Sequence, residues 1–96
     1  MLDRGCKSHG TEICFEYGQR LEKEQGEIHH AATLYDLACQ RGHAAACFAF
    51  GHRLWFGQGI ETNRGIAVEK WRFACERGMA QACAILQRVS FPWQLD

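Results

Sequence analysis

Six cysteines are the residues of this sequence whose type and spacing could do chemistry, and they fall into three pairs with one separation. Each pair has the form C-x7-C, and the pairs are Cys6 with Cys14, Cys39 with Cys47, and Cys75 with Cys83. Thiols at a repeated spacing could form disulfides, bind a metal ion or act as redox groups. Because no C-x2-C motif is present and the cysteines are spread along the chain, the pattern favours disulfides over a zinc or redox site.

The sequence around the cysteines repeats as well. Residues 38–42 (ACQRG) return as residues 74–78 (ACERG), and a weaker copy opens the chain at Gly5. The copies lie 33 residues apart, from Cys6 to Cys39, and then 36 residues apart, from Cys39 to Cys75. A period of this length is typical of helical solenoids, so we predict a repeat protein and not a compact domain with a single core.

The composition excludes several classes of protein. The 96 residues make one small domain, and eleven basic and eleven acidic side chains give a net charge of zero. This balance gives no field that would attract nucleic acid or an anionic membrane, and no apolar run reaches the ~18 residues that a transmembrane helix needs. One proline and ten glycines in a sequence rich in alanine, leucine, glutamate and arginine favour helices over strands.

The cysteines and the N-terminus favour different compartments. An even, repeated set of cysteines indicates a disulfide framework and an oxidising compartment. Residues 1–4 (MLDR) do not begin a signal peptide, which argues for the cytosol, where buried free thiols behave as small hydrophobic side chains. We expect disulfides in a periplasmic or secreted protein whose chain here is a mature or excised piece. A cytoplasmic protein with free thiols is the alternative.

The periodicity predicts helices of two alternating types. First-type helices are expected over 11–24, 44–56 and 80–89, and second-type helices over 28–41 and 64–77. Gly42 and Gly78 stand where a left-handed residue is expected after a helix, and Asn63 is a good N-cap. The single domain 1–96 is therefore divided into a partial repeat 1–10, a repeat 11–42, a repeat 43–78, and a capping helix with its tail, 79–96.

Glycines within helices indicate how closely the two helix types pack. Gly18 and Gly51 occupy equivalent positions, and a mid-helix glycine costs ~1 kcal/mol relative to alanine, so a neighbouring helix should lie too close for a side chain. The third copy has Gln87 there, which predicts that no further helix docks and that this helix caps the array. Pro92 is expected to stop it, with Phe91 and Trp93 folding back over the end.

These spaced positions resemble the Sel1-like repeat, a relative of the tetratricopeptide repeat. The pattern A-C-x2-G-x4-C-x3-G-x2-L, then G-x-G-I, then A-x3-W-x2-A-C covers about Gly5 to Val89. The likeness is greatest to the secreted bacterial cysteine-rich Hcp-type proteins, whose repeats carry a cysteine pair at this spacing. The resemblance implies an all-α, right-handed α/α solenoid of about two and a half repeats that binds other proteins.

The two cysteines of each copy flank the turn of a helical hairpin. Cys39 would end one helix and Cys47 would lie in the first turns of the next, which can bring their Cα atoms within the ~4.4–6.8 Å that a disulfide requires. Equivalent positions in stacked repeats are at least one helix spacing apart, about 8–10 Å. We therefore expect each pair to close its own loop and to contribute about 2.5 kcal/mol in the chain-entropy model.

No pattern for metal binding or catalysis is present. The five histidines include the adjacent His29 and His30, and none forms the i, i+4 pair of zinc-binding helices. The motifs S-x-x-K, H-E-x-x-H and G-x-S-x-G are absent, as are phosphate-binding glycine loops. We expect no metal, no cofactor and no enzymatic activity.

The positions that do not recur between repeats are the candidates for binding a partner. In tetratricopeptide-like folds the first-type helices line the concave face, so we predict contacts there from Glu12, Phe15, Glu16, Gln19, Phe48, His52, Arg53 and Trp55. Phe48, His52 and Trp55 fall at i, i+4 and i+7 and form an aromatic stripe, and aromatic residues and arginine are favoured at interface centres. Packing of Phe48 or Trp55 between neighbouring repeats is the alternative.

We predict a non-enzymatic interaction module or adaptor that binds a protein or peptide through the concave face. An immunity or inhibitor protein for a secreted effector is one alternative, and it would form a single tight stoichiometric complex. A binder of a cell-wall-derived, β-lactam-like small molecule is another, because penicillin binding has been proposed for some Hcp-type relatives. The unpaired N-terminal helix leaves dimerisation open.

Overall fold

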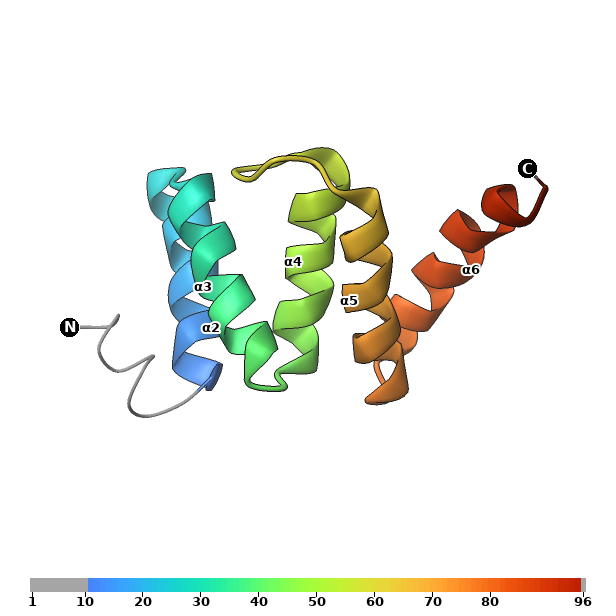
Figure 1. Cartoon of the computed structure of the whole chain (residues 1–96). Coiled ribbons are helices and arrows are strands. Elements are labelled where there is room, and N and C mark those ends of the chain that lie inside the picture. Colours follow the sequence, from blue (N-terminus) through green and yellow to red (C-terminus); the bar gives the residue numbers. More distant parts are fainter. Residues whose placement is uncertain (1–10, 96) are drawn as a thin grey trace.

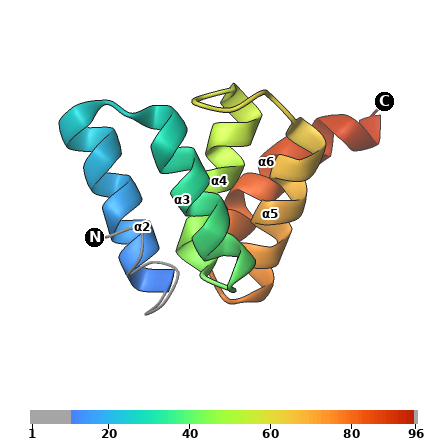
Figure 2. The same cartoon turned by 60° about the vertical axis from the view of Figure 1, so that its left-hand side comes forward.

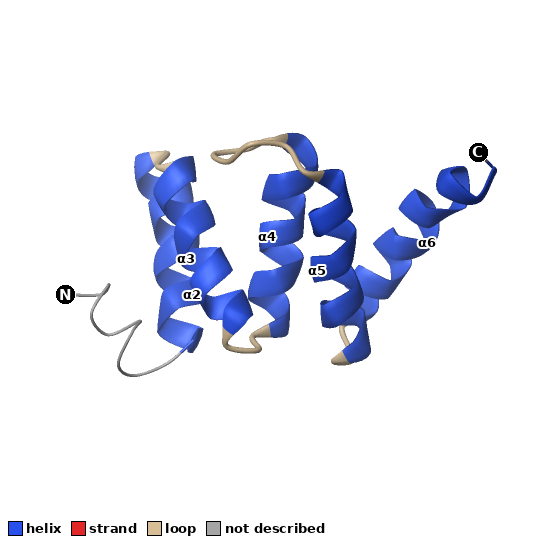
Figure 3. Cartoon of the chain, in the orientation of Figure 1, coloured by secondary structure: helices blue, strands red, loops and turns tan. Residues whose placement is uncertain are grey.

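The computed structural model describes residues 11–95, and the regular elements of this part of the chain are all helices, joined by turns and loops (Figures 1 and 3). Its elements are α2 (Thr11–Arg20), the π-helical turn η1 (Leu21–Gln25), α3 (Ile28–Gln40), α4 (Ala44–Phe56), α5 (Arg64–Glu76) and α6 (Ala80–Leu95). The predicted positions of the helices are confirmed to within a residue at most ends. The partial repeat 1–10 lies outside the described residues.

Each second-type helix ends in the same type of turn, which explains why residues 38–42 recur as residues 74–78. The N–H of Gly42 donates to the carbonyl of Cys39 at 2.9 Å, and the N–H of His43 donates to Ala38 at 3.1 Å. Gly42 has a φ of 94° and Gly78 has a φ of 95°, a region that residues with a side chain rarely adopt. The predicted left-handed glycine after each helix is therefore confirmed, in the form of a Schellman turn.

Two side chains cap helix starts. Asn63 Oδ1 accepts a hydrogen bond from the N–H of Ile66 at 3.0 Å, as predicted for an N-cap. At the start of α4, His43 Nδ1 accepts from the N–H of Ala46 at 3.1 Å. The histidine cap was not predicted, because histidine is not among the residues that usually cap helices.

The helices pack in chain order, α2 on α3, α3 on α4, α4 on α5 and α5 on α6. Figure 2 shows α3 and α5 in front of α4 and α6, so the first-type helices form one side of the array and the second-type helices form the other. The molecule measures 47 × 25 × 17 Å along its principal axes. This elongated shape is that of a short solenoid, in which each helix contacts its neighbours in sequence.

The mid-helix glycines lie where the predicted close approach occurs. A Cβ added to Gly18 would come within 2.9 Å of Tyr35 Cε1, and one added to Gly51 would come within 2.7 Å of Trp71 Cδ1. Tyr35 and Trp71 are buried and occupy equivalent positions on α3 and α5. At the matching position of α6, Gln87 is exposed, as expected where no further helix docks.

Two disulfides staple the turns between second-type and first-type helices. Cys39 pairs with Cys47, with a Cα–Cα distance of 4.5 Å, and Cys75 pairs with Cys83, with a Cα–Cα distance of 4.7 Å. Both pairings were predicted within single copies. Cys14 is fully buried, and its predicted partner Cys6 lies outside the described residues.

The prediction that Pro92 stops the last helix is wrong, because α6 continues to Leu95. A proline within a helix removes one backbone donor and strains the preceding turn, but a helix can continue past it. The predicted fold-back of the Phe91 and Trp93 side chains lies outside the described residues. The first helix also differs from its prediction, since its last turn, η1, is π-helical and ends at Gly26.

Candidate interaction face

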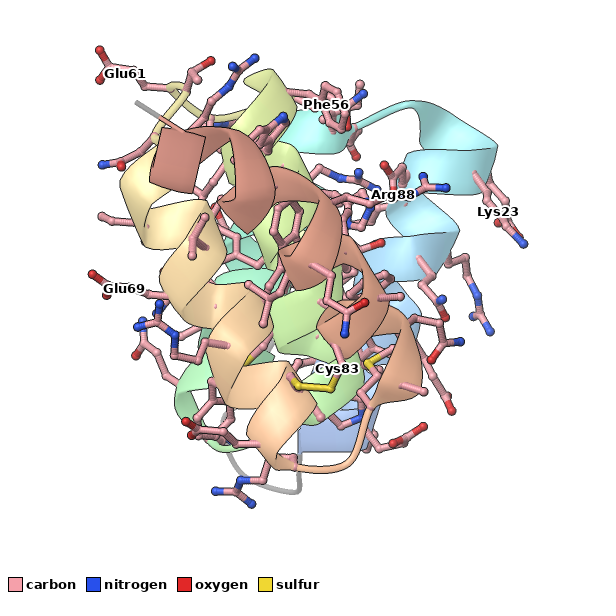
Figure 4. The ribbon with its side chains drawn as sticks, turned by 90° about the vertical axis from the view of Figure 1, so that its right-hand side faces the viewer. Lys23, Phe56, Glu61, Glu69, Cys83 and Arg88 are labelled. Carbon is pink, nitrogen blue, oxygen red and sulfur yellow. A yellow bond between two sulfur atoms is a disulfide. The ribbon has the colours of Figure 1, made fainter. Side chains whose placement is uncertain are left out.

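The side of the array formed by α2, α4 and α6 carries the predicted partner-binding residues, and we call it the first-type face. Glu16 and Gln19 are exposed on α2. Figure 4 shows Lys23 of η1, Phe56 of α4 and Arg88 of α6 on this side, and Glu61 and Glu69 on the opposite side. The face therefore spans all three first-type elements.

A ladder of rings runs along α4 on this face. The Phe48 and His52 rings meet edge to face with centroids 4.6 Å apart, and the His52 and Phe56 rings lie 6.4 Å apart. His52 Nδ1 lies 3.0 Å from the carbonyl oxygen of Phe48, so this nitrogen must be the donor. The hydrogen bond and the ring contacts hold His52 in one orientation between its two neighbours.

Phe56 is the exposed end of this ring ladder, with 60% of its surface accessible. The sequence analysis placed Phe56 within the helix 44–56 but did not count it among the candidates, because it followed the aromatic stripe from Phe48 and His52 to Trp55 at i+7. The signal was available, since Phe48, His52 and Phe56 follow one another at i, i+4 and i+8 along a single helical row. The stripe predicted through Trp55 is therefore better described as a row that ends at Phe56.

Trp55 is partly buried, between α4 and α5. Its ring is 5.4 Å from the ring of Trp71, and the guanidinium of Arg64 covers its other side at 4.6 Å. Trp71 in turn donates from Nε1 to the carbonyl of Phe48 at 3.1 Å. These contacts of Trp55 lie within the second repeat, whereas the alternative interpretation was packing between neighbouring repeats.

Arg53 is engaged within the array and is mostly buried, with 15% of its side chain accessible. It forms an ion pair with Glu22 of η1, and its NH1 donates to Gln58 Oε1 at 2.9 Å. Its guanidinium also lies 5.5 Å from the centre of the Tyr35 ring. Because these contacts join the two repeats, Arg53 has few donors left to offer a partner.

The Tyr35 hydroxyl completes this partly buried polar cluster. It donates to Glu22 Oε1 at 2.8 Å. Burial, followed by the hydrogen bond and the negative charge of Glu22, raises the pKa of Tyr35 to about 12. The cluster of Tyr35, Glu22 and Arg53 is thus a fixed polar contact between repeats, in which the Tyr35 hydroxyl is protonated near neutral pH.

Phe15 and Glu12 form a second contact between repeats, at the other end of α2. The Phe15 ring lies 4.9 Å from the His43 ring and 5.7 Å from the Tyr35 ring. Since Nδ1 of His43 accepts the capping bond, its Nε2 donates to Glu12 Oε1 at 2.8 Å. Phe15 and Glu12 therefore hold α2 against the start of α4, and Glu16 and Gln19 remain the open positions of α2.

Comparison with known proteins supports the resemblance seen in the sequence. No protein-family model and no curated protein sequence matches the chain. Among solved structures, it is similar to Helicobacter pylori cysteine rich protein B, with a TM-score of 0.81 and 27% identity over 88% of this chain and 66% of that chain. The chain has the Sel1-like repeat fold. A Sel1 repeat protein from Oxalobacter formigenes has a TM-score of 0.84 and 20% identity, over 91% of this chain and 68% of that chain.

The expected fold class is therefore confirmed, as a right-handed α/α solenoid of Sel1-like repeats with disulfide staples. The Sel1-like chain spans 66% of the length of the Helicobacter protein and 68% of the length of the Oxalobacter protein. Where the two helix types approach most closely, Gly18 and Gly51 of the Sel1-like array have no side chain and so leave room for the rings of Tyr35 and Trp71.

The described part of the Sel1-like array offers no cluster of three or more histidine, cysteine, aspartate or glutamate side chains arranged to hold a metal ion. None of the helices described is both long enough and apolar enough to cross a membrane. The geometry of the described residues thus gives an exposed ring, Phe56, on a preorganised aromatic row, with polar side chains around it.

Proposed function

We propose that this chain is a non-enzymatic protein-interaction module that binds a protein or peptide through its first-type face. The observation that carries the proposal is the 60% exposure of Phe56 at the end of a ring ladder. A large exposed aromatic side chain is unfavourable in water and is a typical anchor at the centre of an interface. The proposed face is that of the first-type helices, on which the sequence analysis expected a partner to bind.

The residues that hold the row of rings in place make Phe56 well suited to bind a partner. His52 is held by the carbonyl of Phe48 and by ring contacts on both sides, so the row loses little conformational freedom when a partner docks. Binding is tighter when such groups are ordered beforehand, because less entropy is lost on association. Glu16, Gln19, Lys23 and Arg88 would form the polar rim that surrounds an interface core.

We place the interaction outside the cytoplasm, in the periplasm or in the surroundings of the cell. The support for this is the pair of disulfides, Cys39–Cys47 and Cys75–Cys83, because such bonds persist in oxidising compartments and are rare in the cytosol. A partner is accordingly to be sought among secreted or periplasmic proteins.

The test is affinity capture with the oxidised chain from a periplasmic extract and a culture supernatant, followed by titration calorimetry with each captured protein. Phe56→Ser removes the exposed ring, and Ile28→Ser is the matched control, because Ile28 is 39% exposed on α3 of the opposite side. We expect Phe56→Ser to weaken binding at least about tenfold and the control to leave it unchanged. A partner that is lost with Ile28→Ser and retained with Phe56→Ser would contradict the proposed face.

A further inference from the structure

A furrow runs between the two second-type helices on the side opposite the first-type face. Helices α3 and α5 each pack on α4. Two hollows follow one another along the seam between α3 and α5, and both are lined by Lys70. The hollow near the α4–α5 loop has Phe50 and Leu54 of α4 among its lining residues, so α4 forms its floor. We call the two hollows together the furrow.

The end of the furrow beside the helix-terminal turns is basic. Arg41, Lys70 and Arg77 line it, and Glu69 is the one acidic side chain among its lining residues. The whole chain has no net charge, so this excess of cations is local. Charges of one sign gathered in a hollow attract groups of the opposite sign, which here means carboxylates.

Arg77 is held in place without using its hydrogen-bond donors. Its guanidinium lies over the Phe73 ring at 4.6 Å, and its NH2 is 3.5 Å from where a Cβ of Gly42 would be. Neither Arg77 nor Lys70 forms an ion pair or a side-chain hydrogen bond with any described residue. Two cations therefore face the furrow with unused donors, and a guanidinium held flat can bind a carboxylate through two parallel N–H groups.

The other end of the furrow is apolar at its centre. Ile60 and Ile66 lie at its rim above Phe50 and Leu54, and Ile66 is 39% exposed. Asp36 and Glu61 are the acidic side chains that line this end. The charges of the furrow are thus sorted along its length, with cations near the helix-terminal turns and carboxylates near the loop.

We propose that the furrow binds an extended segment of a partner protein that carries an aliphatic side chain and, a few residues away, one or two carboxylates. The aliphatic group would lie on Phe50 and Ile66, and the carboxylates would pair with Lys70 and Arg77. Ile66 and Arg77 lie eleven positions apart on one helix, which is about 16 Å at 1.5 Å per residue. An extended peptide covers that distance in about five residues.

This surface is separate from the one proposed above, and its test keeps the two apart. Short linear peptides displayed on phage are selected on the full oxidised chain, and enriched peptides are then titrated by fluorescence polarisation. We expect enriched sequences to combine an aliphatic residue with acidic residues about two to five positions away. We expect their binding to weaken when salt rises from about 0.1 to about 1 M, because screening shortens from about 10 to about 3 Å.

Substitutions of single residues test whether the enriched peptides bind in the furrow. Lys70→Glu and Arg77→Glu should each weaken the enriched peptides at least about tenfold, as expected when a charge-assisted hydrogen bond is replaced by repulsion. Arg72→Glu is the matched control, because Arg72 is exposed on the same helix and does not line the furrow. Phe56→Ser should change nothing. Thermal melting of each variant shows whether it is folded. Lys70→Glu and Arg77→Glu are two separate tests, so the proposal can still be tested if one of the variants does not fold.

Three outcomes would overturn the proposal. One is a selection that enriches no acidic peptides. Another is an equal loss of binding with Arg72→Glu and Arg77→Glu, which would indicate a general charge effect. The last is a set of acidic peptides that Phe56→Ser abolishes and Arg77→Glu does not, which would assign them to the first-type face instead.

Discussion

The edge of the Trp71 indole lies directly against the backbone of Gly51, so close that a Cβ at this position would be 2.7 Å from Cδ1 and 2.9 Å from Cε2 of the ring. The approach lets Trp71 Nε1 reach the carbonyl of Phe48 at 3.1 Å, and so satisfies a buried donor. The same spacing recurs between Gly18 and Tyr35, where the nearest ring carbon would be 2.9 Å from an added Cβ.

Gly51→Ala should therefore destabilise the protein, although alanine is the better helix former by about 1 kcal/mol. Forcing a methyl group against a buried indole costs about 1–3 kcal/mol and lengthens the bond from Trp71 to Phe48. We expect a net loss of about 1–2 kcal/mol in the free energy of unfolding, measured by urea titration followed by circular dichroism.

Gly65→Ala is the control for this experiment. Gly65 is an exposed residue of α5, and an added Cβ would meet only Asn63 Oδ1, at 3.6 Å. Alanine there should stabilise the protein by about 0.4–1 kcal/mol, because it restricts the unfolded chain. Equal stabilities of Gly51→Ala and Gly65→Ala would show that α5 does not pack on Gly51 as described.

The disulfides make a prediction that can be checked before any variant is made. A thiol titration of unreduced, denatured protein should find no free thiol, since no described cysteine is free. Peptide mapping should link Cys39 to Cys47 and Cys75 to Cys83. Six free thiols would contradict the oxidised state and would redirect the search for a partner to the cytosol.

Removal of one disulfide should cost a predictable amount of stability. The double substitution Cys39→Ser with Cys47→Ser opens a short loop, and the chain-entropy model gives a loss of about 2.5 kcal/mol in the free energy of unfolding. The measurement is a urea titration of the variant beside the wild-type protein under non-oxidising and oxidising conditions. If the wild-type protein in reductant were as stable as in oxidant, the staples would not contribute as argued.

The raised pKa of Tyr35 predicts a loss of stability in alkali. The pKa is about 12 in the folded protein and 10 in the ordinary side chain, so the unfolded state gives up the proton first. The stabilising effect of the neutral hydroxyl is complete below pH 10 and should disappear as the pH rises through 12. Melting temperatures across this range measure it. Tyr35→Phe should remove that step of the pH profile, and an unchanged profile would contradict the assignment to Tyr35.

Trp55 and Phe56 are neighbours in sequence, and we expect their substitution to have opposite consequences. Trp55→Ala removes a ring packed between Trp71 and Arg64, and should lower stability by about 2 kcal/mol, less than the 3–5 kcal/mol of a fully buried aromatic residue. Phe56→Ala removes an exposed ring and should change stability by less than about 0.5 kcal/mol. Thermal melts of the two variants decide the matter, and a larger loss with Phe56→Ala would reverse the assignments.

The sequence by itself determined the repeat, the positions of the helices and the cysteine pairing within copies. These features are local or periodic. Helix faces follow from a period of 3.6 residues, the turn at Gly42 requires a left-handed residue, and two cysteines on either side of such a turn lie within reach of each other. Even the close approach at Gly51 could be predicted, because a glycine that recurs within a helix indicates a neighbour packed against it.

Only the tertiary structure decided which side chains of the candidate face are free. Phe56, Trp55 and Arg53 lie within four positions on one helix, yet the first is exposed, the second packs on Trp71 and the third pairs with Glu22. The furrow between α3 and α5 was not predicted, because it forms between two helices that are not consecutive in the sequence and that both pack on α4. Exposure and hollows depend on how neighbouring helices cover one another, and the periodicity of a single helix contains no information about that.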